Sequence, residues 1–117
     1  MIIGIDMASD TPIYQQVRDE IIKLIGLGEL QSGDELPTVR GLAGDLGVNP
    51  MTIQKSYNIL KNDGFVEIDR RVGVKVASLK NLKDKNYEED LKKILLEGRA
   101  RGYSQEEFIA EVKNLDI

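Results

Sequence analysis

The feature that most restricts the fold of this chain is a pair of short helix-like segments joined by a very tight turn. In "TVRGLAGDLGVNPMTIQKSYNILKNDG", Gly47, Asn49 and Pro50 separate two segments whose apolar residues recur every three or four positions. Glycine ends helices, asparagine caps them, and proline is favoured at the first helical position. We therefore expect one helix that Thr38 caps and Gly47 ends, and a second helix that Asn49 caps and Gly64 ends.

An amphipathic helix is predicted before this pair, after an arm of ten residues. Thr11 precedes Pro12, a pattern that suits an N-cap followed by the first helical position. The apolar residues then recur at helical spacing as far as about Leu27. The expected inner face comprises Ile13, Val17, Ile21, Leu24 and Ile25.

Strand and helix signals follow the tight-turn pair. Residues 65–68 and 72–77 alternate between apolar and polar or small side chains, which predicts a β-hairpin. A polar connector at 78–86 leads to a helix that ends near Gly102. Ser104 and Glu107 then have the spacing of a capping box that begins the last helix.

This order predicts a mainly α fold with a small β-wing, that is, a winged helix-turn-helix followed by a C-terminal two-helix element. In a helix-turn-helix, two helices flank a turn of three or four residues. We expect a DNA-binding domain at residues 1–78 and a helical pair at residues 79–117.

Composition excludes several classes of function. The chain has no cysteine and no histidine, so thiolate nucleophiles, imidazole bases and Cys/His zinc sites are absent, and we expect no enzyme, metal or cofactor. No apolar run approaches the roughly 20 residues that span a bilayer, and the first residues lack a secretory pattern. The sequence therefore predicts a cytoplasmic protein without a membrane partner.

The helix after the tight turn is the candidate DNA-reading element. The second helix of such a motif enters the major groove, and its spacing puts Met51, Gln54, Lys55 and Asn58 opposite the apolar stripe. Gln54 suits adenine, Lys55 suits guanine or phosphate, and Met51 suits a thymine methyl. Thr52 is better placed for the helix end or a phosphate oxygen. The alternative is that these are solvated residues of an ordinary helix.

Two arginines, Arg70 and Arg71, occupy the expected hairpin turn, where they suit a groove or a backbone contact or merely make the turn soluble. Residues 38–71 contain five basic and four acidic residues, a net charge of +1 in a chain of net charge −4. Because phosphate contacts dominate nucleic-acid affinity, so small an excess suggests that two copies bind together.

The segments "PIYQQVRDEI", "SGDELPTVRGLAGDLGVNPMTIQKSYNILKNDGFVEI" and "RRVGVKVA" closely resemble the DNA-binding domain of GntR-type bacterial transcriptional regulators. The short tail resembles the YtrA-like subfamily. The resemblance implies DNA contacts by Arg40, by the start of the reading helix and by the wing tip. The corresponding residues here are Asn49, Pro50, Met51, Thr52, Gln54, Arg70 and Arg71. Many members carry arginine at positions 50 and 54 and glycine at position 71, so their base preferences do not transfer.

The two-helix tail carries apolar stripes that it cannot bury by itself. These residues are Tyr87, Leu91, Ile94, Leu95, Phe108, Ile109, Val112 and Leu115. The resemblance implies a homodimer with the tails as its interface, bound to a palindromic or nearly palindromic double-stranded DNA operator, as expected of a repressor. The alternative is that the tail packs back onto the first helix. A small-molecule effector cannot be identified from the sequence.

A second class of function stays open at this point, namely a winged-helix protein-interaction module without specific DNA readout, because this fold also mediates contacts between proteins.

Overall fold

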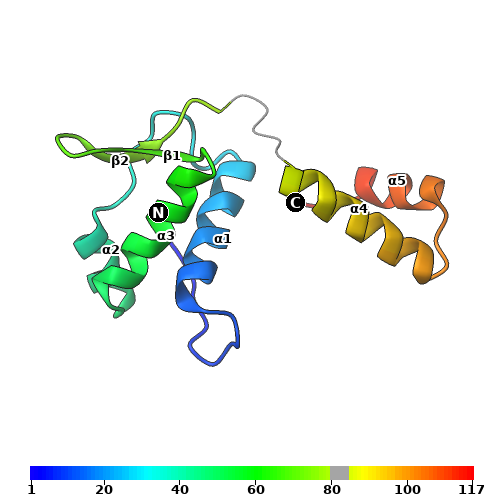
Figure 1. Cartoon of the computed structure of the whole chain (residues 1–117), viewed down its shortest axis with the longest axis horizontal. Coiled ribbons are helices and arrows are strands. Elements are labelled where there is room, and N and C mark those ends of the chain that lie inside the picture. The colour runs from blue at the N-terminus through cyan, green and yellow to red at the C-terminus, as the bar shows by residue number, and fades with distance from the viewer. Residues whose placement is uncertain (80–84) are drawn as a thin grey trace. The chain divides into compact units, whose positions relative to one another are not determined.

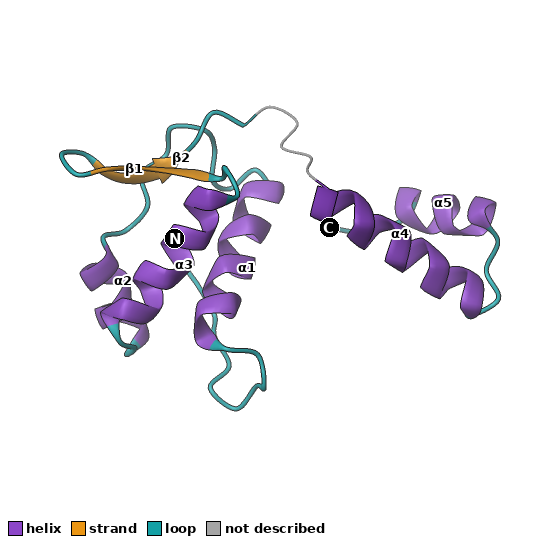
Figure 2. Cartoon of the chain, in the orientation of Figure 1, coloured by secondary structure: helices purple, strands orange, loops and turns teal. Residues whose placement is uncertain are grey.

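The computed structural model describes residues 1–79 and 85–117, with Lys85 described by its backbone alone. The chain forms two compact units, Met1–Lys80 and Asn81–Ile117. Unit 1 contains three helices and a two-stranded antiparallel sheet, and the described part of unit 2 contains two helices (Figures 1 and 2). The predicted fold class, mainly α with a small wing, is therefore confirmed.

Helix α1, Ile13–Gly26, begins one residue later than predicted. Its N-cap is Pro12, whose ψ of 147° is extended, and no side chain caps the helix, so the expected cap by Thr11 is wrong. The side chain of Gln16 instead bonds to the backbone that precedes the helix. Its Nε2 donates to the carbonyl of Thr11 at 2.8 Å, and its Oε1 accepts the N–H of Asp6 at 2.7 Å. Gln16 thereby fastens the N-terminal arm to the helix.

Helix α2, Val39–Leu46, has the predicted termini. The Oγ1 of Thr38 accepts the N–H of Gly41, and Gly47 ends the helix in the left-handed conformation with φ of 69°. A Cβ at position 41 would lie 2.8 Å from that Oγ1. Glycine is a poor helix former, yet here it leaves room for the capping hydroxyl.

Helix α3, Pro50–Asn62, follows after the three residues 47–49. Asn49 caps it by accepting the N–H of Met51 at 2.8 Å, and Pro50 is its first residue. Gly64, with φ of 88°, turns the chain away after the helix. Local cap and turn chemistry thus fixes both ends of α3, as predicted.

The wing consists of strands β1, Val66–Asp69, and β2, Gly73–Val76. Val66 pairs with Val76 and Asp69 with Gly73. Next to the turn, β1 therefore ends one residue after the predicted range 65–68, and β2 begins one residue after the start of the predicted range 72–77. The other edge of β2 bonds to the segment before α2, because the N–H of Leu36 donates to Val74 at 2.8 Å. The wing is therefore tied to the chain on both sides of α2 and α3.

One hydrophobic core fills unit 1, between α1, α2, α3 and the wing. Helix α1 packs along α3, and α2 packs against α3 as well. Ile3 of the arm is only 8% exposed, so the arm contributes to the core, which its sequence did not indicate. The buried apolar residues are Ile3, Val17, Ile21, Leu36, Leu42, Ala43, Ile53, Tyr57, Leu60, Val66, Val76 and Ala77.

The described part of unit 2 consists of helices α4, Lys85–Ala100, and α5, Gln105–Lys113. The predicted connector at 78–86 lies partly outside the described residues, and α4 begins at Lys85, before the predicted end of that connector. The predicted capping box is present: Oγ of Ser104 accepts the N–H of Glu107 at 3.1 Å, and Oε1 of Glu107 accepts the N–H of Ser104 at 3.2 Å. The two helices meet closely at Gly98, because a Cβ added there would lie only 3.7 Å from Cδ2 of Phe108.

Candidate nucleic-acid interface

Helix α3 has one face buried in the core and one face free. Ile53, Tyr57 and Leu60 are fully buried, whereas Gln54 and Lys55 are exposed. A helical repeat of 3.6 residues produces such a division when apolar side chains recur at three- and four-residue spacing. The exposed face is therefore available to a partner, while the buried face fixes its orientation.

The first turn of α3 combines capping with exposure. The side-chain oxygen of Asn49 is already engaged in the cap, and Pro50 has no N–H to donate. Met51 is 78% exposed, and the half-buried Thr52 bonds through its own N–H to the carbonyl of Asn49. Of these four residues, Met51 presents the largest free side chain.

Two contacts hold the exposed polar side chains of α3 in place. The Nε2 of Gln54 donates to Oδ1 of Asn58 at 3.0 Å, and the Nζ of Lys55 lies 3.9 Å from the ring centroid of Tyr14. The first contact leaves Gln54 with an acceptor oxygen and one free N–H, the pair that adenine requires. Asn58 therefore belongs to this face, and its four-residue spacing from Gln54 is a signal for the contact. By contrast, no sequence feature near Lys55 or Tyr14 indicates that these two side chains are in contact.

The remaining basic candidates come from neighbouring elements. Arg40 is the second residue of α2, and Arg70 and Arg71 lie in the turn between β1 and β2. All three side chains are exposed. The hairpin turn projects on the side of unit 1 where α2 lies (Figure 1). Together with Lys55 of α3, the winged motif thus presents basic side chains from three places, namely α2, α3 and the hairpin turn.

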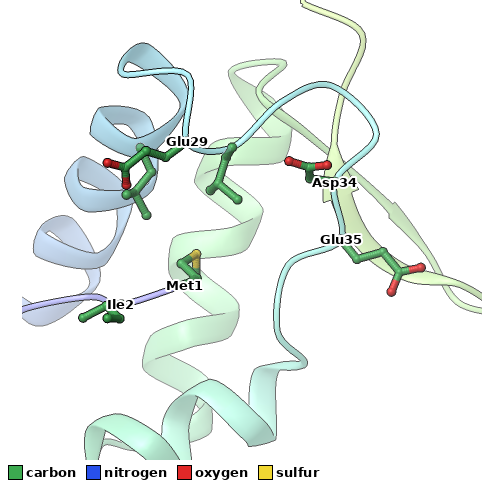
Figure 3. Close-up of a pocket in the computed structure, with 7 residues that line it drawn as sticks. Met1, Ile2, Glu29, Asp34 and Glu35 are labelled. Carbon is green, nitrogen blue, oxygen red and sulfur yellow. The ribbon is translucent and has the colours of Figure 1, made fainter.

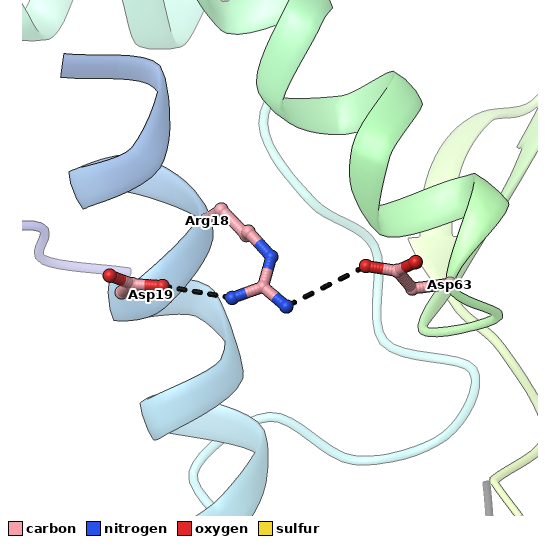
Figure 4. A network of polar contacts seen from close by, with 3 residues as sticks. All are labelled: Arg18, Asp19 and Asp63. Carbon is pink, nitrogen blue, oxygen red and sulfur yellow. Dashed lines mark hydrogen bonds and ion pairs between the residues drawn. The ribbon is translucent and has the colours of Figure 1, made fainter. Parts of the chain in front are cut away.

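Several carboxylates near this surface are already paired. Arg18 of α1 bridges Asp19 at 2.9 Å and Asp63, at the end of α3, at 3.6 Å (Figure 4). This pairing offsets the charge of Asp63 and links α1 to the last turn of α3. Because Arg18 is still 28% exposed, the network contributes only modestly to stability.

The wing carboxylates are engaged as well. Glu67 lies 3.7 Å from Nζ of Lys75 across the strand pair, and Asp69 accepts the backbone N–H of Arg71 at 2.8 Å. These pairings, with that of Asp63, involve three of the four carboxylates counted in residues 38–71. Only Asp63 and Glu67 pair with a cation, and the cation of Asp63, Arg18, is shared with Asp19; the bond to Asp69 leaves its charge in place, so these contacts do not change the net charge of residues 38–71.

Tyr57 connects the core to the segment that leads into α2. Its Oη donates to the carbonyl of Pro37 at 2.8 Å, and burial raises the pKa of this phenol above its usual value. The bond fixes the backbone just before the cap of α2, and so helps to set the position of Arg40 relative to α3.

A hollow of about 460 Å³ lies between the arm and the loop after α1 (Figure 3). It includes three carboxylates, which would repel phosphate, and none of the DNA-contact candidates. Its lining residues are Met1, Ile2, Leu24, Glu29, Leu30, Asp34 and Glu35. The hollow is therefore separate from the interface described above.

Among residues 1–79 and 85–117, no group of three acidic, histidine or cysteine side chains is arranged to hold a metal ion. None of the helices described there is long and apolar enough to cross a bilayer.

The apolar residues of unit 2 divide into an internal set and an exposed set. Leu95 and Phe108 are half-buried, whereas Ile94 and Val112 are 57% and 53% exposed. Leu96, which the sequence pattern did not single out, is exposed too. We call the following exposed residues the tail surface: Tyr87, Leu91, Ile94, Ile109, Val112 and Leu115.

Comparison with known proteins gives a consistent result. A family model described as bacterial regulatory proteins, gntR family, matches residues 13–76. The HTH-type transcriptional repressor YtrA of Bacillus subtilis is 31% identical over 118 residues, which cover 97% of this chain and 91% of that protein.

Solved structures agree with the sequence matches. YtrA from Sulfolobus acidocaldarius, a GntR-family transcription factor, has a TM-score of 0.63 and 40% identity, with 95% of this chain and 93% of that chain covered. The DNA-binding domain of AraR in complex with operator ORX1 has a TM-score of 0.57 and 28% identity, with 64% of this chain and 93% of that chain covered.

Proposed function

The chain belongs to the GntR family of bacterial transcriptional regulators, and we propose on that premise that it is a repressor that binds a palindromic operator as a homodimer. Regulators of this family bind DNA through the winged helix-turn-helix and are not enzymes. Residues 1–78 would form the DNA-binding domain and residues 79–117 the dimerisation domain. The protein would act in the cytoplasm, where a bacterial chromosome lies.

The observation that carries the DNA-binding proposal is the free face of α3. Gln54, Lys55 and Asn58 are exposed there, opposite a fully buried stripe, and all three side chains already have a partner, Gln54 and Asn58 in each other and Lys55 in Tyr14. Preorganised side chains lose less conformational entropy when they meet a ligand. The Gln54–Asn58 bond is common between residues one turn apart on a helix surface, whereas the Lys55–Tyr14 contact joins α3 to another helix.

Each candidate residue has a distinct proposed role. Gln54 reads adenine through its amide, and Met51 contacts a thymine methyl. Arg40 binds the phosphate backbone, and Arg70 and Arg71 bind the backbone or the adjoining groove.

Three residues at the start of α3 complete the proposed site. Asn49 and Thr52 support the helix end and reach phosphate oxygens, whereas Pro50 offers only its ring, because it has no donor. Operator preference should therefore rest on Gln54 and Met51 more than on position 50.

The repressor role rests on the relative named as a repressor, YtrA of Bacillus subtilis, which aligns over nearly the whole of both chains. A bound dimer represses when its operator overlaps the promoter, because it excludes polymerase. A small-molecule effector is not part of this proposal.

Dimerisation is proposed because unit 2 buries little apolar surface by itself. Helix α5 has nine residues and no buried side chain, and short isolated helices are marginal in water. A second tail surface would cover these residues and relate two copies of α3 by a two-fold axis, with Leu95 and Phe108 holding each helical pair together. The two recognition helices would then lie about one DNA turn apart, roughly 34 Å.

A matched pair of variants tests the dimer. Ile94→Glu places a charge on the tail surface, whereas Lys93→Gln changes the net charge by the same amount on an exposed position of α4. Sedimentation should show a dimer for the wild type and Lys93→Gln and a monomer for Ile94→Glu. A monomeric wild type at tens of micromolar chain would refute the dimer.

The DNA proposal is tested by selecting bound sites from random duplexes with the full chain. We expect a palindromic consensus. Arg40→Ala should weaken binding to all duplexes alike, because it removes a phosphate contact. Gln54→Ala should instead relax the preference at one position of each half-site, and an unaltered preference would remove Gln54 from base readout.

A protein-interaction role is the second candidate, and the net charge of −4 favours it slightly. This role predicts different results. In a gel-shift assay the chain would bind no duplex even at low salt, and in a pull-down without DNA it would recover a stoichiometric protein partner.

A further inference from the structure

Tyr14 and Lys55 form a contact between two helices at the edge of the proposed interface. Tyr14 is the second residue of α1, Lys55 lies in the middle of α3, and the ammonium nitrogen is 3.9 Å from the ring centroid. A cation at this distance over an aromatic face is attracted by the ring quadrupole. The lysine side chain is therefore held sideways, toward the beginning of α1.

The pairing leaves the charge of Lys55 available. Among the residues that the structure describes, no carboxylate forms an ion pair with Lys55, and its side chain is exposed. A neutral ring orients the ammonium without cancelling its charge, unlike the carboxylates that pair with Arg18 and Lys75. The ammonium keeps its donors for an incoming anion.

The surroundings of this contact also favour an anion. Helix α1 begins at Ile13 with no side-chain cap and with no acidic residue in its first turn. Unsatisfied N–H groups give a helix N-terminus a partial positive charge. The ammonium of Lys55 is held by a side chain from this same turn, so two sources of positive potential lie close together.

We infer that Tyr14 is a positioning residue that holds Lys55 as a phosphate contact, and that Lys55 therefore sets affinity and salt dependence and takes no part in base readout. This inference rests on the proposed function, because it assigns Lys55 one of the two DNA roles open to it. A compact ammonium suits a phosphate as a point charge. Gln54, which Asn58 orients, is left as the base-reading side chain of this turn of α3.

The contact itself is tested first in the full chain without DNA, by proton NMR of the Lys55 Cε methylene. Protons over an aromatic ring are shifted upfield, so this signal should lie upfield of those of other lysines. Tyr14→Phe should keep the shift, and Tyr14→Leu should remove it. A wild-type signal at the ordinary lysine position would overturn the inference, whatever the chain does with DNA.

The DNA role is tested by fluorescence anisotropy with a labelled duplex that carries the selected consensus. Tyr14→Leu should weaken binding about three-fold per half-site, roughly ten-fold for two half-sites. Lys55→Met should weaken it at least as much, and should lower the slope of log K against log salt by about 0.9 per half-site. Tyr14→Phe should bind like the wild type. Lys23→Met, which removes one charge in the last turn of α1, is the matched control and should bind like the wild type too.

The double variant Tyr14→Leu/Lys55→Met decides the mechanism. If Tyr14 acts through Lys55, the double variant should bind like Lys55→Met alone. Effects that multiply would show that Tyr14 acts independently, and would overturn the inference while leaving the proposed function intact. A changed base preference in Lys55→Met would overturn it as well. A wild type with the upfield signal but no affinity for any duplex would refute the proposed function and the DNA role of Tyr14 together.

Discussion

The bond between Tyr57 and Pro37 offers a quantitative test of how the helix-turn-helix is held together. Tyr57 is fully buried in α3, and its Oη donates to the Pro37 carbonyl at 2.8 Å. Tyr57→Phe keeps the ring and removes only the hydroxyl. Because a neutral intramolecular hydrogen bond contributes about 0.5–1.5 kcal/mol, the variant should be about 1 kcal/mol less stable at pH 7.

The pH dependence gives the same residue a second signature. Burial raises the pKa of the Tyr57 phenol, so the folded chain keeps this proton at a pH where the unfolded chain has lost it. The contribution of Tyr57 to stability is therefore fully present below the unfolded pKa of about 10. Above that pKa it falls by about 1.4 kcal/mol per pH unit, until the folded pKa is reached. At about pH 11 the wild type should lose its advantage over Tyr57→Phe.

Urea unfolding followed by circular dichroism measures both effects, with the two proteins at equal chain concentration. The other tyrosines and the lysines are common to both, so their titration cancels in the difference. Equal stability of the two proteins at pH 7 would refute the role of the hydrogen bond. A difference that stays constant between pH 8 and pH 11 would refute the buried phenol.

Four further substitutions test three local features of the fold by the same unfolding measurement. Gly44→Ala should raise the free energy of unfolding by about 0.5–1 kcal/mol, because the position is open, whereas Gly41→Ala should give no gain, because its Cβ would meet Thr38 Oγ1 at 2.8 Å. Equal gains would contradict this. Ser104→Ala should lower the helicity of unit 2 and cost about 1 kcal/mol, since it removes the capping box, and an unchanged spectrum would count against that. Ser56→Ala should leave the chain as stable or more stable, because the buried Oγ has no partner among the described residues; a loss above about 1 kcal/mol would reveal one.

Features set by neighbouring residues were predictable from the sequence. Thr38, Asn49 and Ser104 cap their helices as expected, because a capping side chain bonds two or three residues along the chain. The same logic failed at Thr11. There the N-terminal arm folds back, and Gln16 bonds to backbone ten residues away.

Features set by tertiary contact were not predictable from one sequence. Ile3 reads as part of a loose arm, yet it is buried in the core. Leu36 bonds to strand β2 from 38 residues away, and Tyr14 meets Lys55 across 41 positions. Periodicity identifies which face of α3 is free, whereas the contacts that orient its side chains depend on how α1 packs along it.

We propose that two copies of this chain, paired through the tail surface, present two α3 helices to one operator. Native mass spectrometry of the wild type with the selected duplex tests it most directly, together with a hydroxyl-radical footprint. We expect two chains per duplex and two symmetrical protected segments about 10 base pairs apart, which is one helical turn. One chain per duplex with a single protected segment would contradict it.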